Sequence, residues 1–387
     1  MAYFSFISLE KSFNYFSERI KQNHKYFSKD ITLWKYLNNK NKKKELSILQ
    51  KEDRLKTLNI GLSLLICLPP KFGLGDAIEY SIAIKSLIKS KRFKKIGIAF
   101  CSNQSHIFRN LFSFSEVFPT LISEEQIKSF DTIFHVTLEI EALKFQKYLR
   151  SNIAEEICKY FNVKLMNIKL KNKETKQKYD NIISIFPVST SVTRSLPGKV
   201  LNLLIEKLKH EYKINIILDE SFFSKSLENY ISESIKNNNC KVIKPKDIKE
   251  LIREVSEIYY GVFVDSGPLH LAKLYDKHGV LVETSVPEEI LLYNTNKIYP
   301  LKNKYISKYC YGPCGLVDIF SFDKRVGCYE TNKISFNEIH NLENLKKLNR
   351  FNKIENNAHF HINPVGCIKK IDVNNLFELI KGKLKEK

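Results

Sequence analysis

The chain has 387 residues, of which 43% are hydrophobic and 27% charged, so it can bury the cores of two domains, and this composition excludes intrinsic disorder. The formal net charge is +21, and the lysines behind it are spread along the whole chain. This charge favours anionic partners: nucleic acid, an acidic membrane surface or phosphorylated substrates. Because the chain lacks an aromatic RNA-binding signature, Cys/His finger spacing and a recognition-helix motif, no nucleic-acid partner is expected.

The N-terminal part of the chain carries no membrane or secretion signal that we can identify. The longest apolar stretch, residues 60–68, is far shorter than the ~20 residues that span a bilayer. Residues 1–11 lack the basic start, apolar centre and cleavage site of a secretory signal. We therefore expect a cytoplasmic protein with reduced cysteines. Residues 1–58, rich in aromatic residues and lysine, are predicted to form an appended helical extension.

From residue 59 onward, short apolar runs alternate with amphipathic stretches, which indicates βαβ units and a parallel sheet. The polar run over 169–179 has no apolar periodicity, so we predict an N-terminal domain over 59–168 and a linker over 169–180. In chain order, the first domain is predicted to hold strands over 60–68, 95–100 and 132–136, helices over 77–89 and 105–114, and a long amphipathic segment over 142–161.

Residues 181–387 repeat the alternation and are predicted to form a second doubly wound domain. In such sheets ligands bind beyond the carboxyl ends of the strands, so functional residues are sought in the loops that follow them. The predicted strands cover 181–186, 214–218, 240–243, 261–264 and 280–284, and the helices cover 197–210, 223–235, 248–258, 268–275 and 376–384.

The loop after the first strand contains Gly73-Leu74-Gly75-Asp76. The two glycines permit a close approach to a ligand, and Asp76 stands at the start of the following helix. An inverting sugar transfer needs a carboxylate that accepts the proton of the attacking hydroxyl, and Asp76 is the candidate. The alternative is that Asp76 is only an N-cap, which the helix dipole favours.

Two loops of the second domain suggest a diphosphate site. Residues 187–197 combine several hydroxyl side chains with Arg194, which is typical either of a phosphate cradle or of an ordinary helix-capping turn. After the strand over 261–264, the run Asp265-Ser266-Gly267-Pro268-Leu269-His270 places a tight turn and a helix N-terminus where a pyrophosphate can bind. His270 adds a donor there, or is simply packed.

Glu220 follows the strand over 214–218. A carboxylate at this place commonly binds ribose hydroxyls, and the alternative is a solvated loop acid.

The motifs G-L-G-D, S-T-x-x-x-R-x-L-P and D-S-G-P-L-H-L-A, in this order, resemble the ADP-heptose:lipopolysaccharide heptosyltransferases, glycosyltransferase family 9. The resemblance spans about residues 60–384. It implies an α/β GT-B fold: two Rossmann-like domains that face each other across a cleft, with the acceptor on the first and the nucleotide sugar on the second. It also implies that Asp76 is the general base and that the donor is bound by Ser189, Thr190, Arg194, Glu220, Asp265, Ser266, Gly267 and His270.

The activity implied by the resemblance is an inverting, metal-independent transfer of a sugar, heptose from ADP-heptose, to a lipopolysaccharide or related surface-glycan acceptor. The nucleotide sugar is a co-substrate, and no further cofactor is expected. From the basic charge we further expect that the acceptor is an anionic glycolipid and that the protein contacts the inner face of the cytoplasmic membrane peripherally. Two alternatives stay open: a GT-B transferase or epimerase for another nucleotide sugar, and a non-catalytic module that binds glycan or nucleic acid.

Three features depart from the family pattern or fall outside it. Arg194 stands where the family often has Lys, Pro69-Pro70 replaces a basic residue, and residues 1–58 are additional.

Cys310, Cys314, Cys328 and Cys367 have the number of ligands of a structural zinc site, but C-x3-C is not the commoner finger spacing. Buried thiols are the alternative, and no metal is predicted.

Overall fold

The computed structural model describes residues 61–386 except 70–71, 101–102, 120–121, 137–139, 141–150, 171–180, 237–238, 315–327, 329, 331–360 and 365. The predicted N-terminal extension and most of the predicted linker lie outside the described residues. The chain divides into two compact units with a boundary between Asn167 and Ile168, which we call the first and the second unit. No helix among the described residues is long and apolar enough to cross a membrane.

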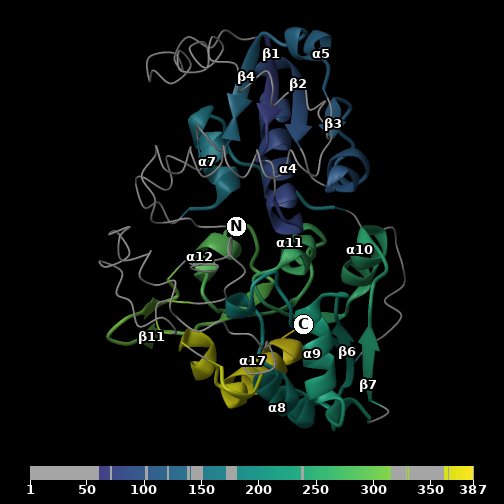
Figure 1. Ribbon diagram of the computed structural model, residues 1–387, viewed down its shortest axis with the longest axis vertical. Coiled ribbons are helices and arrows are strands. Elements are labelled where there is room, and N and C mark those ends of the chain that lie inside the picture. The colour runs from purple at the N-terminus through teal and green to yellow at the C-terminus, as the bar shows by residue number, and fades with distance from the viewer. Residues whose placement is uncertain are drawn as a thin grey trace. The chain divides into compact units, whose positions relative to one another are not determined.

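The first unit contains a four-stranded parallel sheet in the order β3-β2-β1-β4. The inner strand β1 is apolar except for Ser63 and is buried from Ser63 onward, as expected for a parallel strand covered on both faces. Helix α4 packs against α7 beside this sheet (Figure 1). The bounds are β1 Leu62–Cys67, α4 Leu74–Lys89, β2 Phe93–Phe100, a π-helical turn Ile107–Leu111, β3 Val117–Pro119, α5 Glu124–Lys128, β4 Thr132–His135 and α7 Ile153–Tyr160.

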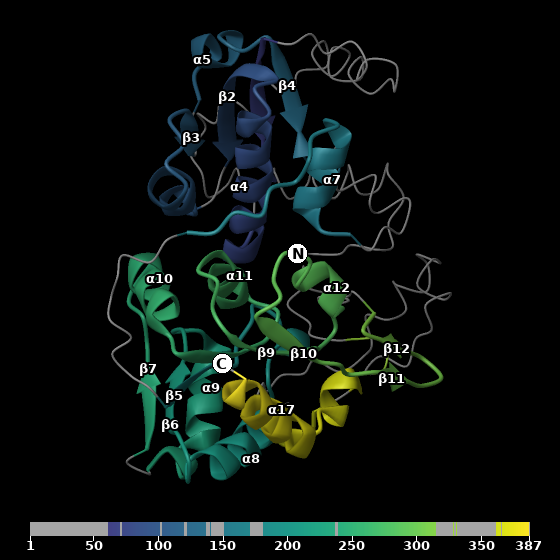
Figure 2. The same cartoon turned by 180° about the vertical axis from the view of Figure 1, so that it is seen from behind.

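The second unit contains a six-stranded parallel sheet in the order β10-β9-β8-β5-β6-β7 (Figure 2). The chain runs from β5 outward to β7 and then returns to β8 on the other side of β5, so the strand order reverses between β5 and β8. The bounds are β5 Ile182–Phe186, α8 Gly198–Leu208, β6 Lys213–Ile217, α9 Phe222–Ile231, β7 Cys240–Ile243, α10 Ile248–Glu257, β8 Tyr260–Phe263, α11 Gly267–Leu274, β9 Gly279–Val282, α12 Glu288–Leu291, β10 Ile298–Leu301, β11 Tyr305–Ile306, β12 Tyr311–Gly312 and α17 Val373–Lys385.

Strands β8 and β9 approach each other closely at a glycine. A Cβ atom on Gly279 would lie 2.3 Å from the carbonyl oxygen of Gly261, nearer than any side chain tolerates. The register pairs Gly261 with Gly279 and Phe263 with Leu281. The loops that follow these two strands therefore leave the same edge of the sheet side by side.

The α/β class predicted from the alternation of apolar runs is confirmed by the two parallel sheets. The strand predicted over 240–243 is β7, and the helix predicted over 77–89 begins three residues earlier as α4. The prediction missed β3, α5, α12 and β10, which have three to five residues and show no period of their own. Strands of similar length, such as β7, could be predicted from their place between longer helices. The predicted helix over 223–235 is wrong in its last turns, since α9 ends at Ile231 and a 3-10 turn follows.

Candidate active site

The point where the strand order reverses, between β5 and β8, is where open parallel sheets bind ligands. Two of the sequence-predicted loops leave the sheet there: the loop after β5 that carries Arg194, and the loop after β8 that carries Asp265. These side chains are 71 residues apart in the chain, yet the Arg194 Nη1 atom donates to Asp265 Oδ2 over 3.0 Å. The fold thus brings two of the predicted site residues into direct contact.

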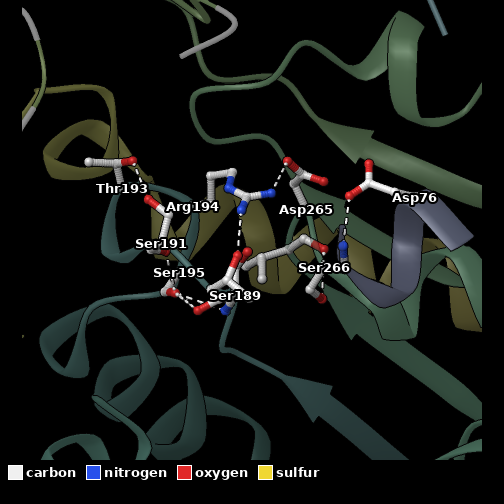
Figure 3. A network of polar contacts seen from close by, with 11 residues as sticks. Asp76, Ser189, Ser191, Thr193, Arg194, Ser195, Asp265 and Ser266 are labelled. Carbon is white, nitrogen blue, oxygen red and sulfur yellow. Dashed lines mark hydrogen bonds and ion pairs between the residues drawn. The ribbon is translucent and has the colours of Figure 1, made fainter. Parts of the chain in front are cut away.

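The Arg194–Asp265 ion pair is buried, with side chains 6% and 7% exposed (Figure 3). Arg194 Nη2 also donates to Thr190 Oγ1 over 2.7 Å. Burial by itself raises the pKa of the Asp265 carboxyl, but the Arg194 charge and, to a lesser degree, His270 hold this pKa below its usual range. Arg194 Nε is buried without a hydrogen-bond partner among the described residues. Arg194 therefore joins the two loops and retains one unused donor.

The hydroxyl side chains of the loop after β5 serve mainly to fold that loop. Ser195 Oγ donates to the Ser191 carbonyl over 2.8 Å, and it accepts from the Ser189 amide over 2.9 Å. The Ser191 and Thr193 hydroxyls lie 2.8 Å apart in a hydrogen bond (Figure 3). These contacts hold a 3-10 turn over Val192–Arg194, which carries the Arg194 side chain. The sequence left a phosphate cradle and an ordinary turn open for these hydroxyls, and the contacts of Ser191, Thr193 and Ser195 within the loop favour the turn.

The loop after β8 leads directly into the N-terminus of α11. Ser266 is the N-cap residue, but its hydroxyl donates back to the Val264 carbonyl over 3.3 Å and makes no capping bond to the helix. The first turn of α11 therefore has no side-chain cap from Ser266, and its amides and dipole favour an anion. Gly267 opens this turn, and His270 lies in it as a buried residue.

Glu220 follows β6 and, unlike the Arg194–Asp265 ion pair, is not buried. Its side chain is exposed and lies 3.6 Å from Lys225. The neighbouring Asp219 instead shapes the turn, since its carboxylate accepts from the Ser221 amide and the Ser224 hydroxyl. A ribose contact by Glu220 stays a prediction.

Asp76 lies in the first unit, as the third residue of α4. The N-cap residue is Gly73, so the alternative that Asp76 is the N-cap is wrong in position. Its carboxylate nevertheless accepts a hydrogen bond from the Gly73 amide over 3.0 Å (Figure 3). The Phe72 ring packs edge-on against Tyr80 and Phe100, which anchors this loop on the core. The half-buried carboxylate is thus held in the loop region after the carboxyl end of β1, the end at which open parallel sheets bind ligands.

The four cysteines of the C-terminal part influence one another. A hydrogen bond with Cys314, then burial, then the nearby Cys328 and Cys367 raise the pKa of the Cys310 thiol. Burial raises the pKa of Cys367 in the same direction. Within the described ranges, no group of three or more His, Cys, Asp or Glu side chains has the arrangement of a metal site.

Helix α8, which follows the Arg194 loop, begins at a buried imidazole. The Gly198 amide donates to His361 Nδ1 over 3.2 Å, and the ring lies 4.8 Å from that of Phe223. Burial lowers the pKa of His361 from 6.5 to about 4. The neutral ring is therefore part of the folded state.

Acidification is expected to destabilise the protein in the range set by this histidine. Between pH 6.5 and about 4 the unfolded state binds more protons than the folded state at His361, so stability falls as the pH falls. The full effect of one such group is about 3 kcal/mol. We expect His361→Gln to flatten part of the dependence of the thermal midpoint on pH. His135, whose pKa burial also lowers to about 4, contributes in the same direction. If the thermal midpoint of the variant depends on pH as steeply as that of the wild type, His361 does not contribute to the pH dependence.

The two α/β units, each with a parallel sheet, are consistent with a GT-B fold. No family model and no curated protein matches the sequence. Among solved structures, a family 9 glycosyltransferase from Veillonella parvula matches with a TM-score of 0.50 and 10% identity, over 85% of this chain and 99% of that one. The ADP-heptose lipopolysaccharide heptosyltransferase II of E. coli matches with a TM-score of 0.48 and 11% identity, over 64% and 91%. The iron-containing dodecameric glycosyltransferase TibC of E. coli gives 0.49 and 14%, over 76% and 80%. At 10% identity, the likeness to the Veillonella parvula structure shows the fold.

Proposed function

We propose that this protein is an inverting glycosyltransferase that takes its sugar from a nucleoside-diphosphate sugar. The observation that carries the proposal is the buried Arg194–Asp265 pair, which joins the two loops at the reversal of strand order beside the helix α11. A helix N-terminus at this edge is a ready-made site for a diphosphate. The fold shared with the family 9 structure from Veillonella parvula is in keeping with this chemistry.

In the proposed donor complex the diphosphate lies at the start of α11. The amides of Gly267 and the following turn, with Ser266 and His270, donate to its oxygens. Arg194 contributes its unused Nε–H, and Ser189 and Thr190 border the phosphates from the loop after β5. Because Asp265 neutralises Arg194, the helix amides supply most of the remaining attraction for the anion. Glu220 is the proposed ligand of the ribose hydroxyls.

In the proposed reaction Asp76 accepts the proton of an acceptor hydroxyl. The hydroxyl oxygen forms a bond to the anomeric carbon of the donor sugar as the bond from that carbon to the diphosphate oxygen breaks. The nucleoside diphosphate leaves with the electron pair, and the configuration at the carbon inverts. The donors at the α11 N-terminus stabilise the negative charge that develops on the leaving group.

The particular substrates that we propose follow the motif resemblance and the charge. The donor is an ADP-sugar, with heptose as the first sugar to test, and the acceptor is a lipopolysaccharide or related anionic glycolipid. A net charge of +21 favours such an acceptor at an acidic membrane surface on the cytoplasmic side. The alternative is a transferase or epimerase of the same fold that uses another nucleotide sugar.

Thermal stabilisation by nucleotide sugars tests the proposal. Ligands that bind only the folded state raise its stability by about 2.7 kcal/mol at roughly 100 times Kd. We expect ADP-heptose to raise the thermal midpoint more than GDP-, UDP- or CMP-sugars. If another sugar nucleotide raises the thermal midpoint most, the proposed transferase activity stands and the proposed donor changes. If none of them raises it, the proposed function is contradicted and a binding module of another kind is favoured.

A further inference from the structure

Two adjacent hydroxyl groups follow β9 in the second unit and are buried without hydrogen-bond partners among the described residues. Thr284 is 1% exposed and Ser285 is 4% exposed, and in the part of the chain that the structure describes neither Thr284 Oγ1 nor Ser285 Oγ has a hydrogen-bond partner. An unsatisfied buried hydroxyl costs about 1–3 kcal/mol, so such groups are rare in folded proteins. Two such hydroxyls in succession indicate that they are retained for a function, although they lower the stability of the fold.

These hydroxyls lie at the ligand edge of the sheet. Strand β9 pairs with β8 in parallel, so the segment after β9 leaves the sheet next to Asp265 and Ser266, which follow β8. The third buried donor without a partner at this edge is Arg194 Nε, in the loop after β5. Buried polar groups without a hydrogen-bond partner among the described residues therefore lie together beyond the carboxyl ends of β5, β8 and β9.

The segment that carries the two hydroxyls is held firmly at both ends. The Glu283 carboxylate accepts from the Glu288 amide over 2.9 Å and from the Asn303 amide over 2.8 Å. Lys273, a buried residue of α11, donates through Nζ to the carbonyl of Leu291 at the end of α12 over 2.7 Å. The proposed diphosphate helix and the hydroxyl segment thus belong to one fixed framework, and Thr284 and Ser285 are preorganised.

We propose that Thr284 and Ser285 form the subsite that hydrogen-bonds the sugar of the nucleotide-sugar donor, an inference that rests on the proposed function. A neutral hydroxyl donates and accepts, which matches sugar hydroxyls, while a diphosphate needs the amides and cationic groups already assigned to it. The subsite lies next to the α11 N-terminus, where the diphosphate and hence the sugar attached to it are proposed to bind. These two residues therefore select the sugar and leave nucleotide binding unaffected.

Calorimetric titration of Thr284→Val and Ser285→Ala tests the subsite. The probes are two pairs, ADP-heptose with ADP and UDP-N-acetylglucosamine with UDP. We expect each substitution to raise the Kd of the sugar nucleotide that the wild type binds by about five- to tenfold, and to leave that of the matching nucleoside diphosphate unchanged. Ser256→Ala, which removes an exposed hydroxyl of α10, is the matched control and leaves both constants unchanged.

The thermal midpoint without ligand separates a binding role from a structural one. Because the hydroxyls have no partner to lose, both variants are expected to keep or raise the midpoint. A lowered midpoint with equal weakening of sugar nucleotide and nucleoside diphosphate overturns the subsite, as does unchanged binding of both. If the wild type binds the nucleoside diphosphate as tightly as the sugar nucleotide, the subsite is wrong while nucleotide binding stands. If it binds none of the four probes, the proposed function fails and the subsite with it.

Discussion

Replacing Asp76 with Asn is expected to reduce sugar transfer by roughly 100- to 10,000-fold while donor affinity stays unchanged, because the amide cannot accept the proton of the acceptor hydroxyl. The side-chain oxygen of Asn still accepts from the Gly73 amide, so the start of α4 is retained. The loss of charge near the helix N-terminus costs about 0.3–1 kcal/mol of stability. Product formation under single-turnover conditions and donor titration are the two measurements.

A matched control comes from the same unit. Asp131 Oδ2 accepts from the Ser63 amide over 2.7 Å, the same kind of carboxylate-to-backbone contact, but it precedes β4 at the amino end of the sheet. Asp131→Asn is expected to leave the transfer rate near that of the wild type. Equal loss of rate in both variants, or retained transfer in Asp76→Asn, would rule out Asp76 as the base.

Replacing Arg194 with Met is expected to lower the free energy of unfolding by about 3–5 kcal/mol, because it leaves the buried Asp265 carboxylate without its partner. Adding Asp265→Asn in the same chain should recover part of this loss, since the stranded charge is then gone. Unfolding in urea, followed for the single and double variants, gives the coupling energy. Additive losses would show that the two side chains do not stabilise each other.

The same pair predicts a pH dependence that differs from that of His361. The pKa of Asp265 lies below its ordinary value of 3.8, so the pair contributes stability above that pH, which is lost as the pH falls through the folded-state pKa. In the double variant the loss of stability at low pH should be smaller, because the Asp265 carboxylate is gone. Donor affinity of the double variant is also expected to fall, because the loop after β5 is no longer joined to the loop after β8.

Local spacing in the sequence was sufficient to predict most of the fold. The longer elements β1 and α4 show their periods over six or more residues, and the short strands β5 to β8 could be predicted from their alternation with helices. The loops that carry Asp76, Arg194 and Asp265 could be found for the same reason, because each follows a predicted strand. Motif order added the resemblance that suggested a GT-B fold. The three-residue strand β3 and the single helical turn α12 were not predicted, because elements of that kind show no period of their own.

What only the tertiary structure decided is which side chains meet. The sequence marked Arg194 and Asp265 separately, but their contact depends on the strand order that places β5 beside β8. Likewise, the sequence could not decide whether the hydroxyls in the loop after β5 bind phosphate or form a turn, and the structure pairs Ser191 with Thr193 and Ser195. Nothing in the sequence pointed to Thr284 and Ser285. Hydrogen-bond satisfaction is a property of the folded chain, because a donor's partner lies either within its own loop, as for Ser195, or in a segment that the sheet brings alongside, as for Arg194. Composition and periodicity determine the elements, and strand order and burial determine which polar groups remain for a substrate.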